Sequence, residues 1–181
     1  MAHRIEVKFK DHLVDVLGAK VAKRIREDLN LEVENVRIIE AYTIDRRISS
    51  ENLALIAEVP FSDSISQETS IGKPLAAKMI WDWLVEVGFR PGVTDNVGRT
   101  AREAITAISN IKFKDNEAVY TSKQYLLTGN LEKGQVETIA SGLLANELIQ
   151  YFRIVPFKKF NKNKGLDRKS TRLNSSHRIR Y

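Results

Sequence analysis

Polar and apolar residues alternate strictly over residues 4–10, where Ile5, Val7 and Phe9 share one face. This period of two predicts a half-buried strand. From Leu17 to Leu29 the apolar residues recur every four positions instead, which predicts an amphipathic helix with Asp15 as its N-cap. By the same criteria we expect strands at residues 36–44, 65–71, 81–90, 119–127 and 148–155, and helices at about 49–58, 95–108 and 135–145, with a brief helical bridge at 75–80.

The second half of the chain repeats the pattern of the first. At an offset of about 80 residues, identities fall at strand and helix-start positions. They pair Glu6, Val7, Phe9, Asp15, Gly18 and Ile25 with Glu86, Val87, Phe89, Asp95, Gly98 and Ile105. At an offset of about 83 they pair Val36, Tyr42, Ile56, Ala57, Gln67 and Ile71 with Val119, Tyr125, Ile139, Ala140, Gln150 and Ile154. We interpret this as an internal duplication, with repeat one at 4–71 and repeat two at 81–155.

Each repeat reads as strand–helix–strand–helix–strand, which is near the lower size limit for an independent core. Two repeats can pair as a pseudo-dimer that joins their sheets and buries the helices on one side. The predicted fold class is therefore α+β, with one such domain over residues 1–157.

Composition limits the classes of protein and the cellular compartments that fit this domain. The chain is 43% hydrophobic and has no cysteine, which excludes disulfides and thiolate chemistry. It contains no membrane-length apolar run and no secretory pattern, so we expect a cytoplasmic protein without a membrane partner.

The basic character of the chain is concentrated at its end. Residues 158–181 hold nine basic residues and one acid, a charge of +8, so the other 157 residues carry −2 of the total of +6. We expect 158–181 to be a disordered basic tail. Residues 169–177, KSTRLNSSH, resemble translated vector sequence rather than native protein, so we expect no nucleic-acid partner.

The chain offers little catalytic chemistry. The turn GVTDNVG at 92–98 allows two interpretations, an anion site at a helix start or a helix cap followed by a small residue for packing. Glu6 and Glu86 are either an acid–base pair across the pseudo-dimer or members of a solvated strand face. We predict no catalytic, cofactor-binding or metal-binding residue, because no histidine or carboxylate spacing fits such a site.

The Pro-Gly turn distinguishes the second repeat from the first. Two arginines flank it, and their cations allow phosphate binding, a solvated surface or a contact with another domain. We predict an interdomain contact at Arg90, Pro91, Gly92 and Arg99.

The run EVGFRPGVTDNVGRTAREAI at 86–105 carries a family resemblance. Together with RIEVKFKD at 4–11, VLGAKVAKRI at 16–25 and LLANELIQYFRI at 143–154, it resembles the N-terminal PurS-like domain of large single-chain phosphoribosylformylglycinamidine synthases. The resemblance implies a truncated fragment of a purine-biosynthesis ligase that uses ATP, Mg²⁺ and glutamine. In that family this domain mimics a dimer of a small stand-alone subunit and bridges the synthase and glutaminase domains, which carry the catalytic residues.

The resemblance therefore implies a fragment that has no activity of its own. It needs no cofactor, and its partners are the synthase and glutaminase domains of the same chain. The alternative is a stand-alone tandem α+β module that binds a small ligand or regulates another protein, with a pocket between the two repeats.

Overall fold

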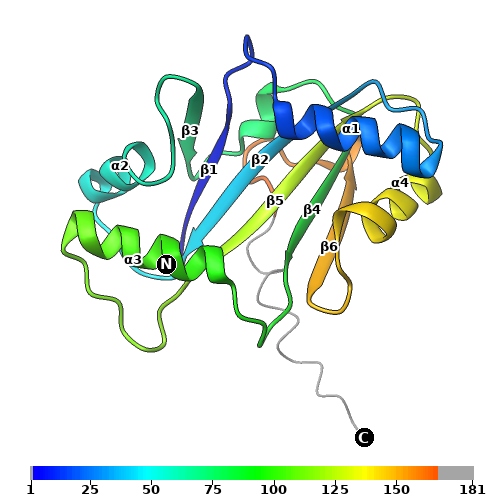
Figure 1. The fold of residues 1–181 in the computed structure, drawn as a ribbon. Helices are drawn as coiled ribbons and strands as arrows, with labels where there is room; N and C mark the ends of the chain where they lie inside the picture. The colour runs from blue at the N-terminus through cyan, green and yellow to red at the C-terminus, as the bar shows by residue number, and fades with distance from the viewer. Residues whose placement is uncertain (1, 167–181) are drawn as a thin grey trace, which may run out of the picture.

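Within residues 2–166, which the computed structural model describes, six strands form one antiparallel sheet in the order β3–β1–β2–β5–β4–β6 (Figure 1). The strands are β1 (His3–Phe9), β2 (Asn35–Ile44), β3 (Gln67–Ile71), β4 (Trp83–Phe89), β5 (Val119–Thr128) and β6 (Gln150–Pro156). The α-helices are α1 (Val16–Leu29), α2 (Ser50–Glu58), α3 (Asn96–Ser109) and α4 (Lys133–Ile139). Short turns of other helix types are η1 (Leu75–Lys78), η2 (Ala140–Leu144) and η3 (Phe157–Lys159). The predicted α+β class is confirmed.

The sheet places corresponding strands of the two halves at corresponding positions. β2 and β5 lie at its centre and pair along ten residues each, from Asn35 opposite Thr128 to Ile44 opposite Val119. β1 and β4 flank this pair, and β3 and β6 form the two edges. The order is symmetric about the β2–β5 pair, and the pseudo-dimer itself stays a prediction.

An aspartate starts the first long helix of each half and ties it to a central strand. Asp15 accepts hydrogen bonds from the backbone N–H groups of Gly18 at 2.8 Å and of Ile38 at 2.7 Å. Asp95 accepts equivalent bonds from Gly98 at 2.7 Å and from Thr121 at 2.6 Å. Each carboxylate therefore caps a helix and fixes its distance from β2 or β5.

The glycine three residues after each aspartate permits that close approach. A Cβ atom on Gly18 would lie 2.1 Å from the carbonyl oxygen of Val36, and one on Gly98 would lie 2.2 Å from that of Val119. No larger residue fits without moving the helix away from the strand.

All four α-helices lie on one face of the sheet (Figure 1). Each of the two hydrophobic clusters on this face combines side chains from both halves. In one cluster α1 and α4 pack over β4 and β5, through residues such as Ile25, Val85, Leu127 and Ile139. In the other, α2 and α3 pack over β1, through residues such as Ile5, Ile56 and Ile105. Neither half therefore has a core of its own.

The second face of the sheet is partly covered by η1 and by the segment after β6. A third cluster lies there and contains Ile39, Leu75, Trp81, Leu84, Phe160 and Leu166. The expectation of a disordered tail from residue 158 is wrong for 158–166, because Phe160 and Leu166 are 8% and 5% exposed. Residues 167–181, including 169–177, lie outside the described part of the chain.

The apolar side chains explain why this lysine-rich segment packs on the sheet. The indole of Trp81 meets the rings of Phe157 and Phe160 edge-on, with centroids 4.9 and 5.1 Å apart. Such contacts stabilise the segment by burying aromatic surface that a solvated tail would leave in water. Within residues 2–166 no helix is both long and apolar enough to cross a membrane.

Candidate functional site

The predicted contact residues lie where β4 ends and α3 begins. Pro91, Gly92 and Arg99 are exposed, and Gly92 has a φ of 85°, a conformation that favours glycine. The side chain of Arg90 donates from Nε to the carbonyl oxygens of Glu147 and Gln150, both at 2.9 Å. The contact of these four residues with another domain stays a prediction.

Arg90 has a structural counterpart at the other end of the sheet. Lys10 follows β1 as Arg90 follows β4, and its Nζ donates to the carbonyl oxygens of Ser64 and Ile65 at 2.7 and 3.0 Å. Both cations fasten the end of one strand to the loop that precedes an edge strand. The hydrogen bonds of Arg90 therefore have a structural role at an otherwise exposed turn.

The carboxylate of Asp95, which belongs to the GVTDNVG turn itself, takes up the hydrogen-bond donors around this turn. Asp95 accepts from the N–H of Gly98, from the N–H of Thr121 and from the Thr121 hydroxyl. Gly98 also faces β5 too closely for a side chain. These contacts confirm the interpretation as a cap plus a packing glycine, and they give no support to an anion site there.

The structure brings Glu6 and Glu86 together through Arg4. The Nε atom of Arg4 donates to Glu6 Oε1 and its Nη2 donates to Glu86 Oε1, both at 2.9 Å. The expected solvated face is wrong, because Glu6 and Glu86 are only 2% and 5% exposed. The backbone N–H of Leu75 in η1 donates to Glu6 Oε2 at 2.8 Å, so the connector between the halves covers the first of these carboxylates.

The two carboxylates offset the cost of burying the charge of Arg4. Burial opposes the charge of Arg4, but the carboxylates of Glu86 and Glu6 outweigh it and raise the Arg4 pKa above its ordinary value. Gln124 donates to Glu6 Oε1 at 3.2 Å, and the Ser122 hydroxyl donates to Glu86 Oε1 at 2.9 Å. Both carboxylates thus face fixed donors instead of a substrate, which favours a structural role.

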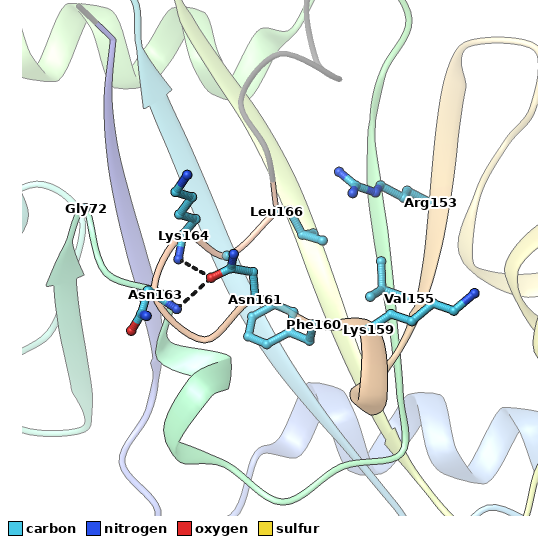
Figure 2. Close-up of a pocket in the computed structure, with 10 residues that line it drawn as sticks. Gly72, Arg153, Val155, Lys159, Phe160, Asn161, Asn163, Lys164 and Leu166 are labelled. Carbon is cyan, nitrogen blue, oxygen red and sulfur yellow. Dashed lines mark hydrogen bonds between the residues drawn. The ribbon is translucent and has the colours of Figure 1, made fainter.

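A cavity of about 710 Å³ lies on the second face, between the connector after β3 and the segment after β6 (Figure 2). Its cations are Arg153, Lys159 and Lys164, and within residues 2–166 no carboxylate lines it. Phe160 and Leu166 form part of its apolar wall. The volume falls in the range of small-molecule sites in proteins.

Sequence reasoning missed this cavity and the arginine between the two glutamates. A signal existed for each. The lysine-rich run contains or adjoins the apolar residues Phe157, Phe160 and Leu166. Arg4 lies two positions before Glu6 and so shares its strand face. Among residues 2–166, no group of three or more His, Asp or Glu side chains is placed to hold a metal ion.

Comparison of the chain with protein-family models and with curated proteins gave no match.

Proposed function

We propose that this chain is the N-terminal bridging domain of an ATP- and glutamine-dependent phosphoribosylformylglycinamidine synthase, a cytoplasmic ligase of purine biosynthesis. The domain is non-catalytic by itself and couples the synthase and glutaminase domains, while ATP and Mg²⁺ belong to the full enzyme. The resemblance of residues 86–105 to the PurS-like family is the starting point for this proposal.

The observation that carries the proposal is the single sheet shared by two matched halves. β2 and β5 join the halves at the centre, and the helices of each half pack over strands of the other. This is the build expected of a domain that mimics a dimer of a smaller subunit. A body with a common core transmits the position of one partner to the other without an internal hinge.

The two ends of the sheet offer equivalent places for two partner domains. β3 and β6 run in opposite directions, because five antiparallel pairings separate them, so the loops before them lie at opposite ends. Ile65 in one loop is 83% exposed and Leu148 in the other is 87% exposed. Each loop thus presents one exposed apolar side chain, and we assign these two loops as the contact points for the partner domains.

The test combines the gene with a coupling assay. The reading frame beyond residue 157 of the native gene should encode a synthase core. The purified chain should neither hydrolyse glutamine nor turn over ATP. Added to a synthase–glutaminase chain that lacks its own N-terminal domain, it should raise amidine formation with glutamine as the nitrogen source more than formation with free ammonia.

Surface variants sharpen that assay. Ile65→Ser and Leu148→Ser should lower the glutamine-dependent rate, while Ile80→Ser, at a side chain 91% exposed in the connector, is the matched control. Glutamine or ATP turnover by the chain alone, or an unrelated reading frame after residue 157, would overturn the proposal.

A stand-alone ligand-binding module is the second candidate. The cavity beside Arg153 favours it, because Gly72 from the connector after the first half and residues 159–161 and 163–166 after the second half line the space. This candidate requires a ligand that binds there in the absence of any catalytic domain.

A further inference from the structure

We propose that the cavity on the second face binds a small organic phosphate, with the phosphate between Lys164 and Arg153 and the organic part against Phe160. This site is separate from the bridging role, because it uses neither the loops at the ends of the sheet nor a partner domain. It does not depend on the identity of the full enzyme.

The charge of the lining residues selects an anion. Lys159 and Lys164 are exposed, and in the described chain neither is paired with a carboxylate. Arg153 already has another interaction, so it adds its charge to the wall, while Lys164 supplies an ammonium group that has no carboxylate partner within residues 2–166. These cations attract a phosphate dianion more strongly than a singly charged carboxylate.

Lys164 and Arg153 lie on two sides of the cavity. In the view of Figure 2, Arg153 and Lys164 lie on opposite sides of Asn161 and Leu166, whereas Lys159 points outward. The side-chain oxygen of Asn161 accepts hydrogen bonds from the backbone N–H groups of Asn163 and Lys164, at 3.0 Å each. This turn fixes the loop and leaves the Asn161 amide N–H groups as further donors.

The apolar wall argues for an organic phosphate over the free inorganic ion. Phe160 and Leu166 are buried side chains that border the cavity. An aromatic or aliphatic group attached to the phosphate would cover this wall and gain hydrophobic stabilisation that inorganic phosphate cannot.

The experiment titrates the full chain with inorganic phosphate and with phenyl phosphate at constant ionic strength, and follows backbone amide signals by NMR. We expect saturable shifts at residues 159–166 and at Gly72, with tighter binding of phenyl phosphate. Lys164→Ala should weaken binding about tenfold, the effect of losing one charge-assisted hydrogen bond.

Lys162→Ala is the matched control. It removes the same charge from the same loop, but its ammonium group lies over the Phe157 ring, 4.9 Å from the centroid, and does not line the cavity. Equal weakening by Lys162→Ala and Lys164→Ala would overturn the proposal, as would shifts confined to residues 167–181 or no saturable shift at all. Equal affinity for the two phosphates would overturn the organic part of it.

Discussion

Replacing Arg4 with methionine tests whether Arg4, Glu6 and Glu86 form a buried ionic cluster on the second face of the sheet. Methionine keeps most of the length of the side chain but removes both hydrogen bonds to the carboxylates. Glu6 then retains two donors, the N–H of Leu75 and the amide of Gln124, whereas Glu86 retains the Ser122 hydroxyl. Two negative charges remain buried without their cation.

The expected loss is large for a single substitution. Removing one partner of a buried ion pair costs about 3–5 kcal/mol, because the remaining charge is left in a medium that solvates it poorly. Proteins of this size are stable by about 5–15 kcal/mol, so Arg4→Met should lower the urea midpoint strongly without unfolding the chain outright.

The measurement is urea unfolding near neutral pH, followed by tryptophan fluorescence. Arg24→Met is the matched control, because Arg24 pairs with Asp28 on the exposed surface of α1 and both side chains are about half exposed. That variant should lose less than about 1 kcal/mol. An equally small loss for Arg4→Met would refute the buried cluster and restore the solvated face.

Three further predictions concern packing and titration. Gly98→Ala should lower stability by about 1–3 kcal/mol, since its Cβ would lie 2.2 Å from a carbonyl oxygen. A Cβ on Gly134 in α4 would have no neighbour within 4 Å, so Gly134→Ala should raise the melting temperature. Phe160→Ala should lower the free energy of unfolding by about 3 kcal/mol and shift the fluorescence emission of Trp81 to longer wavelength. An unchanged emission spectrum would mean that the segment after β6 is solvated. Burial raises the pKa of Tyr42 to about 12, so its contribution to stability is complete below about pH 10 and lost as the pH rises to 12. Tyr42→Phe should remove that part of the alkaline loss of stability, and urea midpoints across this range check it.

Most elements were predictable because their signals are local. Asp15 and Asp95 stand where a capping carboxylate is needed, and Ser49 caps α2 at the start expected for that helix. The strands followed from alternation, with ends that differ by a few residues. The helix expected at 135–145 instead changes to a π-helical turn at Ala140, a distinction that apolar spacing does not encode.

The candidate site was predicted only in part. The turn at Arg90 lies on the surface as expected, but its tether to the loop before β6 depends on a contact 57 residues away. The matched positions of Glu6 and Glu86 allow an acid–base pair or a solvated face, whereas the structure shows both carboxylates buried on Arg4. Nothing near Glu6 in the sequence indicates that η1 covers it.

Local sequence signals were thus sufficient for the order of strands and helices, the capping residues and the α+β class, because those depend on periodicity and on hydrogen bonds spanning a few residues. Three other properties needed the folded chain: the strand order, the burial of the Arg4 cluster and the cavity beside Arg153. Each arises where segments far apart in the chain meet, as when Gly165 approaches Pro74. Burial and charge pairing are set by such meetings, and a side chain with the same sequence neighbours is solvated or enclosed according to what packs over it.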